Sequence, residues 1–104
     1  MYKIIRTDKA DELIHQIILN IAKKFGADVA LKRLDKMEAD IMHLADDPLL
    51  GEVPRYSFLK RQGYRALILE KDIVFYKIDD EQKIITIYAV FDQRQDYISI
   101  LRGL

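Results

Sequence analysis

The chain has 104 residues, half of them hydrophobic and a third charged, which is the composition of one packed domain spanning residues 1–104 and excludes disordered and fibrous classes. Its 17 basic residues balance its 17 acidic residues, so net charge gives no general attraction to nucleic acid or anionic lipid, and polyanion binding requires a local patch. Cysteine is absent and no apolar run reaches the roughly 20 residues of a bilayer span, so we expect a cytoplasmic protein without disulfides, thiolate metal sites or membrane contact.

The N-terminal half predicts a strand followed by two helices. The apolar run YKIIR ends at Thr7 and Asp8, either of which can cap a following helix. Apolar residues then recur every three or four positions from Leu13 to Phe25, and Gly26 stands where a helix end favours positive φ, so the first helix covers about 8–25. A second apolar stripe begins at 27 and ends before Pro48. Two helices joined so closely form an antiparallel hairpin.

The second half predicts a loop and then strands. Both prolines and one glycine fall in 46–54, where we place the loop. The runs YRALILE, DIVFYKID and KIITIYAVF are separated by short polar turns and indicate an antiparallel meander, and RYSFL at 55–59 reads as one more strand. The runs from 73 and 84 are apolar on both faces, so these strands should be central. The predicted fold is a two-layer α+β domain, β-α-α-β-β-β-β with a short polar tail.

Metal, cofactor and nucleophile chemistry find little support in this sequence. His15 and His43 stand singly on separate predicted helices, without a second histidine one turn away. Ser57 and Ser99 lack a glycine-flanked elbow, and there is no glycine-rich phosphate loop. We therefore expect no metal and no cofactor.

Most carboxylates have a structural explanation. Acidic residues at 8, 11 and 12 lie in the first turn of a predicted helix, where the helix dipole favours negative charge. Asp35, Glu38 and Asp40 alternate with Lys32, Arg33 and Lys36 at helical spacing. This second group is most simply a solvated helix face.

A cluster of basic residues in the second half is the candidate binding surface. Four basic residues fall within eleven positions, alternating with Tyr56, Phe58 and Tyr64: Arg55, Lys60, Arg61 and Arg65. Arg94 and Tyr97 follow the last predicted strand. Guanidinium groups bind phosphate oxygens and tyrosine rings stack on bases, so the mixture suits nucleic acid. The competing interpretation is that these are turn charges and interface tyrosines.

The order of elements and several motifs resemble the RelE/ParE superfamily, the toxins of type II toxin-antitoxin pairs. The similarity runs from YKIIRTDKADELIHQI through the helical hairpin to VFYKIDDEQKIITIYAVFDQRQDY. The ending is the most specific part, because a hydrophobic strand leading into DQRQDY resembles the family's last strand, its arginine loop and a closing DY. The resemblance implies a helical hairpin packed on an antiparallel sheet, and a cognate antitoxin that covers the toxin in a hetero-oligomer.

The resemblance also implies a target and site residues. RelE-like members cut mRNA on the ribosome, whereas ParE-like members poison DNA gyrase. Arg65 resembles the basic residue after an aromatic on the second-half hairpin, Arg94 the arginine of the final loop, and Tyr97 the closing aromatic of some nuclease sites. These three are the expected catalytic residues if the chain is a nuclease, and we expect Arg65 and Arg94 on one exposed rim of the sheet. The expected target-binding residues are Arg55, Lys60, Arg61, Arg65 and Arg94.

Departures from the nuclease pattern leave three hypotheses open. RelE-like enzymes carry an arginine just ahead of the VFY strand core, where this chain has Ile73 and Val74. RNA cleavage also needs groups that move protons, for which only Tyr97 or Glu52 are at hand. The neutral charge and Ile73 favour a gyrase poison without chemistry of its own. Arg65, Arg94 and Tyr97 favour a ribosome-dependent endoribonuclease. In the third hypothesis the chain has lost toxicity and only binds an antitoxin or DNA.

Overall fold

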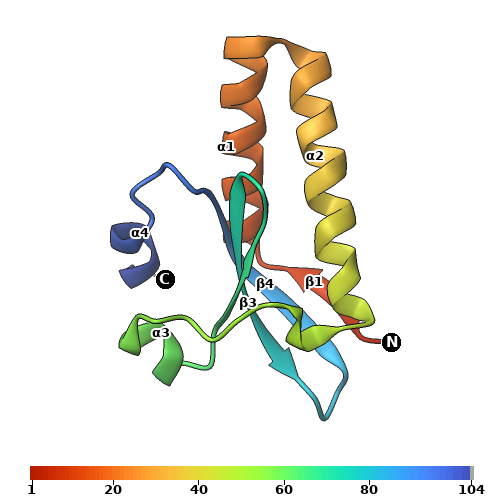
Figure 1. Cartoon of the computed structure of the whole chain (residues 1–104), viewed down its shortest axis with the longest axis vertical. Coiled ribbons are helices and arrows are strands. Elements are labelled where there is room, and N and C mark those ends of the chain that lie inside the picture. The colour runs from red at the N-terminus through yellow and green to blue at the C-terminus, as the bar shows by residue number, and fades with distance from the viewer. Residues whose placement is uncertain (104) are drawn as a thin grey trace.

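The computed structural model describes residues 1–103 and arranges them as a four-stranded sheet with helices on both faces (Figure 1). The strands lie in the spatial order β1-β4-β3-β2. The elements in chain order are β1 (Lys3–Arg6), α1 (Asp8–Phe25), α2 (Ala27–Met42), the 3-10 turns η1 (His43–Ala45) and η2 (Pro48–Leu50), α3 (Ser57–Arg61), β2 (Arg65–Ile68), β3 (Asp72–Asp79), β4 (Ile84–Asp92) and α4 (Ile98–Arg102). The α+β class is confirmed.

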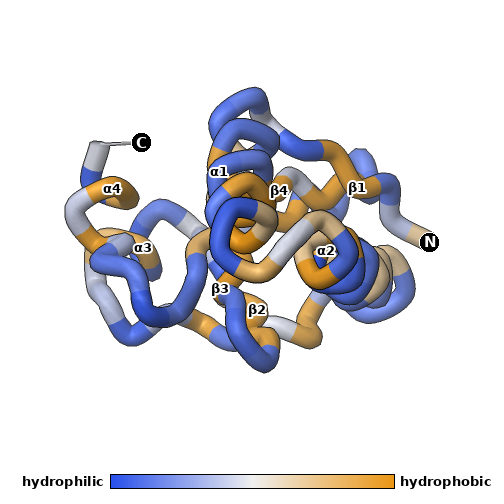
Figure 2. Tube along the Cα trace, turned by 90° about the horizontal axis from the view of Figure 1, so that it is seen from above, coloured by the Kyte–Doolittle hydropathy of each residue, from blue (hydrophilic) through white to orange (hydrophobic). Residues whose placement is uncertain are grey.

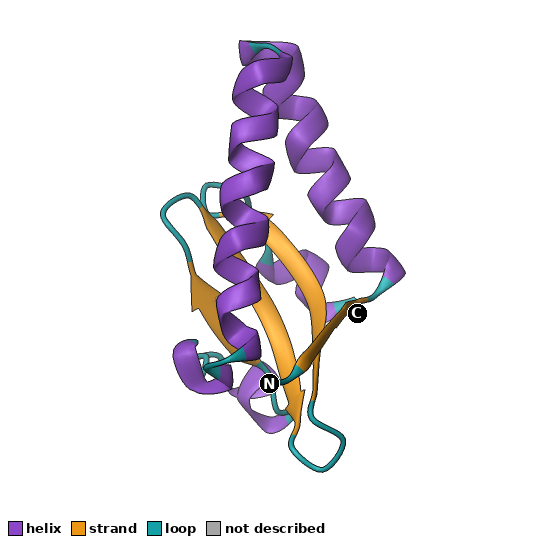
Figure 3. Ribbon diagram, turned by 90° about the vertical axis from the view of Figure 1, so that its right-hand side faces the viewer, coloured by secondary structure: helices purple, strands orange, loops and turns teal. Residues whose placement is uncertain are grey.

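The predicted helical hairpin is confirmed, with its local signals in place. The Thr7 hydroxyl accepts a hydrogen bond of 3.0 Å from the amide of Ala10 and so caps α1. Gly26 has φ 93°, and its amide donates to the carbonyl of Ala22 at the end of α1. Positive φ is nearly free of strain only for glycine, so the turn between the helices needs this residue. The hairpin projects well beyond the sheet (Figure 3).

The sheet is mixed, because its first strand pairs differently from the others. β2, β3 and β4 form the predicted antiparallel meander, with β3 and β4 central as expected. β1 lies parallel to β4, with Ile4 opposite Ile85. Parallel neighbours require a long crossover connection. The chain between β1 and β4 contains α1 and α2 as well as β2 and β3, so these two long helices can pack across one face of the sheet.

The face under the hairpin has a largely aliphatic core. α1 and α2 contribute Ile14, Ile17, Met37 and Ile41, and the strands contribute Val74, Tyr76, Ile85, Ile87 and Val90, all of them buried. Burial of one such aliphatic side chain stabilises a fold by about 1.5–3 kcal/mol. This core therefore holds the hairpin on the sheet.

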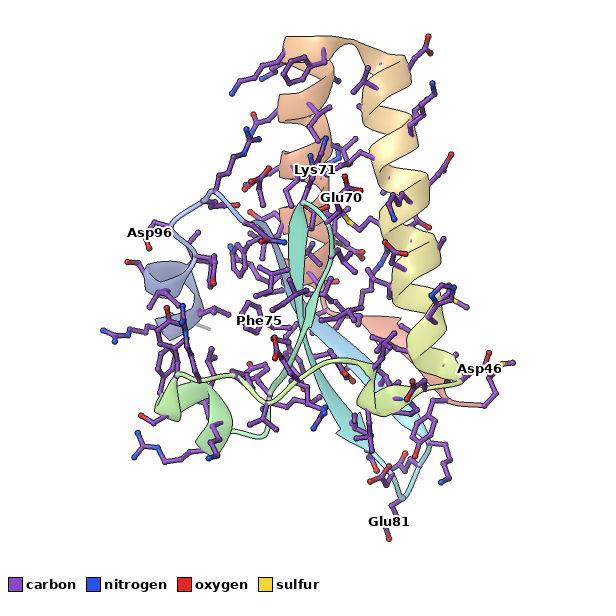
Figure 4. All side chains as sticks on the ribbon, viewed as in Figure 1. Asp46, Glu70, Lys71, Phe75, Glu81 and Asp96 are labelled. Carbon is purple, nitrogen blue, oxygen red and sulfur yellow. The ribbon has the colours of Figure 1, made fainter. Side chains whose placement is uncertain are left out.

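The opposite face has an aromatic core, covered by two short helices. Phe75 and Phe91 project from the central strands, and Leu59 of α3 and Leu101 of α4 are 1% and 4% exposed. Figure 2, a view down the hairpin, shows α3 and α4 on the other side of the strands from α2. Figure 4 places Phe75 between the sheet and these helices. The two-layer description therefore holds for the hairpin half, and α3 with α4 adds a partial third layer.

Two sequence predictions about this third layer are wrong. The RYSFL segment at 55–59 does not form a strand. From residue 57 it belongs to helix α3, and the outer edge of β2 pairs instead with Glu52, whose amide and carbonyl both bond to Ala66. The C-terminal tail also contains a helix, α4. Its apolar residues Ile98, Ile100 and Leu101 pack on the aromatic face of the sheet.

Candidate target-binding surface

Arg65 lies at the start of β2, against the loop that follows α2. Its Nη2 donates to the carbonyl of Gly51 at 2.6 Å and approaches that of Leu49 at 3.5 Å. Its Nε is buried and has no partner within residues 1–103. Beside it, the Tyr76 hydroxyl donates to the carbonyl of Pro48 at 2.7 Å and accepts from the amide of Gly51 at 3.0 Å. A valine at position 65 could not donate to these carbonyls, so Arg65, together with Tyr76, holds the loop to the sheet.

Arg94 lies just after β4 and is bound to a neighbouring carboxylate. Its Nε and Nη2 donate to the two oxygens of Asp92, each at 3.1 Å, and its amide donates to Asp92 at 2.9 Å. Its side chain is nevertheless 85% exposed. The hydrogen bonds from Arg94, with a further one from Arg33, hold the pKa of Asp92 well below its usual range.

Arg33 of α2 joins the ends of two strands to the hairpin. Its Nε and Nη2 donate to the oxygens of Asp72 at 3.0 and 2.5 Å, and Nη2 also reaches Asp92 at 3.2 Å. Asp72 is only 3% exposed, and its hydrogen bond raises the pKa of Arg33. The prediction that Arg33 belongs to a solvated helix face is therefore wrong. Antiparallel pairing places Asp72 opposite Asp92. Two aspartates at the adjoining ends of paired strands were the feature of the sequence that could have predicted an arginine partner for them.

The structure does not bring Arg65 and Arg94 together. Arg65 pairs with Tyr76, and Tyr76 pairs with Ile87 on β4. Asp92 lies five residues beyond Ile87 on β4, a distance of about 16 Å at the usual rise of a strand. Arg94 lies two residues further along the chain. The two arginines also contact different partners, the loop after α2 and the carboxylate of Asp92. The expected common rim is therefore not formed.

Tyr97 belongs to the aromatic core. Its ring stacks on Phe91 with centroids 5.6 Å apart and an interplanar angle of 22°, and it is tilted against Phe75 at 5.8 Å. Tyr97 immediately precedes α4 and is partly buried. It therefore helps to position α4 on the sheet.

The remaining basic candidates lie on α3 or just before it, and with one residue of α4 they define a surface that we name the α3–α4 basic patch: Arg55, Lys60, Arg61 and Arg102. All four are exposed, and none of them forms an ion pair within the described part of the chain. Arg102 was missed because a tail with one arginine gives no sign that it folds back onto α3. Its Cζ lies 5.2 Å from the ring centre of Phe58, so cation–π attraction joins the two helices.

A second aromatic group lies further along the same face of the sheet. Tyr64 and Tyr88 meet edge to face with centroids 5.4 Å apart. The Nζ of Lys77 lies 4.5 Å from the ring centre of Tyr64 and 5.1 Å from that of Tyr88. Burial raises the pKa of the Tyr64 hydroxyl, and the neighbouring Tyr88 adds a smaller contribution in the same direction.

Two grooves lie away from the α3–α4 basic patch. One, of about 480 Å³, runs between α2 and the outer edge of β2 and is bordered by His43 and Glu52. The other, of about 450 Å³, runs between α1 and the segment after β4, where Lys24 and Arg94 border it. Neither groove contains Arg55, Arg61 or Tyr97 in its lining.

Residues 1–103 contain no group of three or more His, Cys, Asp or Glu side chains placed to hold a metal ion. Over the same residues, no helix combines the length and apolar character that crossing a bilayer requires.

Comparisons with known proteins identify a matching family and solved structures of similar fold. A family model described as the ParE toxin of the type II toxin-antitoxin system, parDE, matches residues 4–97. The chain is similar to a solved structure of the chromosomal ParDE toxin-antitoxin system from P. aeruginosa, with TM-score 0.73 and 20% identity over 88% of this chain and 96% of that chain. No curated protein sequence matches it.

Two further solved structures share this fold. The RelBE2 toxin-antitoxin complex from Mycobacterium tuberculosis gives a TM-score of 0.61 at 20% identity, covering 88% of this chain and 98% of that chain. The isolated E. coli RelE toxin gives 0.56 at 14% identity and covers both chains completely. At such identities the similarity establishes the fold, and the family rests on the match to residues 4–97.

Proposed function

The chain belongs to the ParE family of toxins from type II toxin-antitoxin systems, and from this premise we propose that it stops growth by binding DNA gyrase. In this proposal the toxin performs no chemistry of its own and instead traps gyrase on cleaved DNA. A cognate antitoxin keeps it inactive until the antitoxin is lost. Both proteins and the target would share the cytoplasm.

The observation that carries this proposal is that each candidate nuclease residue is engaged in its own contact within the fold. Cleavage of a phosphodiester needs a base, an acid and cations within hydrogen-bond reach of one phosphate. Here Arg65 donates to Gly51, Arg94 donates to Asp92, and Tyr97 stacks on Phe91. Glu52 lies at the outer edge of β2. This arrangement supports action by binding more than action by catalysis.

The alternative is a RelE-like endoribonuclease that cuts mRNA on the ribosome. The α3–α4 basic patch favours it, because basic and aromatic side chains adjoin there, with Arg55 5.6 Å from the ring centre of Tyr56. Such a surface suits single-stranded RNA, whose bases stack on aromatic rings. Fold similarity extends to RelE as well as ParDE structures, so it does not separate the two targets.

Gyrase assays with purified toxin test the proposal. We expect the toxin to inhibit supercoiling and to accumulate cleaved plasmid in the presence of gyrase. The variant Tyr97→Phe should inhibit gyrase as well as the wild type does, because it keeps the stacked ring and loses only the hydroxyl. A normal rate of supercoiling at high toxin excess would contradict the gyrase target.

Programmed ribosomes provide the opposing assay. We expect no mRNA cleavage by the wild-type toxin. If cleavage occurs, and Arg94→Ala and Tyr97→Phe each lower its rate by about ten- to ten-thousandfold, the endoribonuclease alternative replaces the gyrase proposal.

The antitoxin is tested separately from the target. We propose that an adjacent open reading frame encodes a short acidic protein that binds this chain. Binding to the folded toxin alone must raise its melting temperature by mass action. Co-purification with a higher melting temperature than that of the free toxin is the expected result. An adjacent product that leaves the melting temperature unchanged is not the antitoxin.

A further inference from the structure

The α3–α4 basic patch concentrates positive charge in a chain whose total charge is zero. Residues 53–64 carry Arg55, Lys60 and Arg61 and no acidic residue, and residues 97–103 carry Arg102 and no acidic residue. The packing of α3 and α4 over the same aromatic core places these two segments side by side. Clustered charge of one sign creates a local potential that the neutral total does not reveal.

The distribution of arginines makes this patch distinct from the rest of the surface. Arg6, Arg33 and Arg94 form ion pairs with aspartates. Arg65 donates to backbone carbonyls. The other three arginines of the chain are Arg55, Arg61 and Arg102. All three lie in the α3–α4 basic patch, and none forms an ion pair within residues 1–103.

The patch is supported from beneath. Leu59 and Leu101 are buried in the aromatic core and hold α3 and α4 in place. The guanidinium groups of Arg55 and Arg102 lie over the rings of Tyr56 and Phe58. A guanidinium placed over a ring retains its planar set of N–H donors for a phosphate. Such contacts restrict the side chains in advance and so reduce the entropy lost when a ligand binds.

The surroundings of the patch favour a nucleic acid over a protein segment. Of the exposed large hydrophobic residues of the described chain, Val53 lies two residues before Arg55, and the others lie elsewhere, among them Phe25 and Val29 of the hairpin and Leu49 and Ile68 near β2. Neither α3 nor α4 carries one, and both grooves lie outside the patch. Protein interfaces have an apolar centre depleted in charge, whereas interfaces with DNA are strongly basic and polar.

We propose that the α3–α4 basic patch binds the phosphodiester backbone of double-stranded DNA. This inference deepens the proposed function and rests on it for its biological setting, because a toxin bound to gyrase is next to the DNA that gyrase holds. The contact is to phosphates and does not depend on the base sequence of the DNA. Gyrase itself would be bound through other surfaces, and the patch would add affinity once DNA is present.

A salt titration with DNA alone tests the patch without gyrase. The fluorescence anisotropy of a labelled 30-base-pair duplex is measured as wild-type toxin is added at several salt concentrations. Contacts to about four phosphates give a slope of about −3 to −4 in a plot of log affinity against log salt. The triple variant Arg55→Gln, Lys60→Gln, Arg61→Gln should bind at least tenfold more weakly at low salt, with a slope near −1.

Matched variants separate the patch from general charge. The triple variant Lys23→Gln, Lys24→Gln, Lys32→Gln removes the same number of exposed charges from the hairpin and should keep the wild-type slope. The variant Arg55→Lys, Arg61→Lys retains the charge and should keep most of the slope, which guards against a folding defect in the glutamine variant. Equal losses in the two triple variants, or no binding by the wild type at low salt, would overturn the proposal.

Two further arms identify the nucleic acid and its setting. A single-stranded RNA of the same length should bind no more tightly than the duplex, and a tenfold preference for RNA would overturn the assignment to DNA. Toxin binding to gyrase is then measured with and without DNA. We expect DNA to strengthen the binding of wild-type toxin to gyrase. It should not strengthen the binding of the glutamine variant. Failure to bind gyrase at all contradicts the proposed function, while the duplex titration still decides whether the patch binds DNA.

Discussion

The two faces of the sheet are built from different side chains. The arginines on one face bind groups of the protein itself, whereas those on the other face form no ion pair within residues 1–103. The face under α1 and α2 has an aliphatic core covered by helices of 18 and 16 residues. On that side Arg33 and Arg65 bind carboxylates and backbone carbonyls of the protein itself. The other face has an aromatic core, covered by two helices of five residues each. Its arginines have no ionic partner within residues 1–103.

This difference separates stability from recognition within one small sheet. Isolated helices much shorter than about 12 residues are marginal in water, so α3 and α4 depend on burial of Leu59 and Leu101. The hairpin face has the larger cluster of buried residues, most of them aliphatic. The exposed arginines of the short helices form no ion pair within residues 1–103 and therefore contribute little to folding.

The largest expected effect is the loss of Arg33 on the stable side. Arg33→Ala leaves the buried carboxylate of Asp72 without its partner, which costs about 3 kcal/mol of unfolding free energy. Arg61→Ala, on the α3–α4 basic patch, should change the same quantity by less than about 0.5 kcal/mol. Urea denaturation of the two variants measures the contrast. Similar losses would show that the patch arginines are structural after all.

A smaller effect is expected where the loop after α2 lies against β2 and β3. A Cβ added at Gly51 would lie 2.6 Å from the Tyr76 hydroxyl and 2.8 Å from the carbonyl oxygen of Ala66. Gly51→Ala should therefore lower stability by about 1–2 kcal/mol through overpacking. Gly103→Ala, after α4, would meet its nearest atom, the Ile100 oxygen, at an ordinary 3.5 Å and should be neutral. Thermal melting compares the two, and equal melting temperatures would refute the close contact at Gly51.

The smallest effect concerns the pH dependence of stability. The pKa of Asp92 is lower in the folded chain than its usual 3.8 because Arg94 and Arg33 bind the charged form. Asp92 therefore contributes stability above about pH 4, and that contribution is lost as pH falls below this value. Asp92→Asn should reduce the loss of stability between pH 6 and pH 3, whereas Asp96→Asn, which changes an exposed carboxylate outside the network, should not. An unchanged pH profile for Asp92→Asn would contradict the ion-pair network.

Local sequence patterns predicted the elements whose signals lie within one segment. The 3.6-residue apolar period, the Thr7 cap and Gly26 identified α1 and α2, and apolar residues on both faces identified β3 and β4 as central. The segment at 55–59 was misassigned because so short a run of apolar, polar and basic residues suits a short helix as well as a strand. Its state depended on Glu52 already occupying the edge of β2, a contact between distant residues that no local period encodes.

For the candidate site, the sequence by itself determined that Arg55, Lys60 and Arg61 lie close together, because they are neighbours on one short segment. Only the tertiary structure decided that Arg102 joins them, that Arg33 leaves the solvated face for Asp72, and that Arg65 and Arg94 lie far apart. The physical reason is that strand register and helix packing set distances between residues remote in sequence. The sequence shows which charged side chains are present. It does not show which of them form ion pairs or hydrogen bonds in the folded protein.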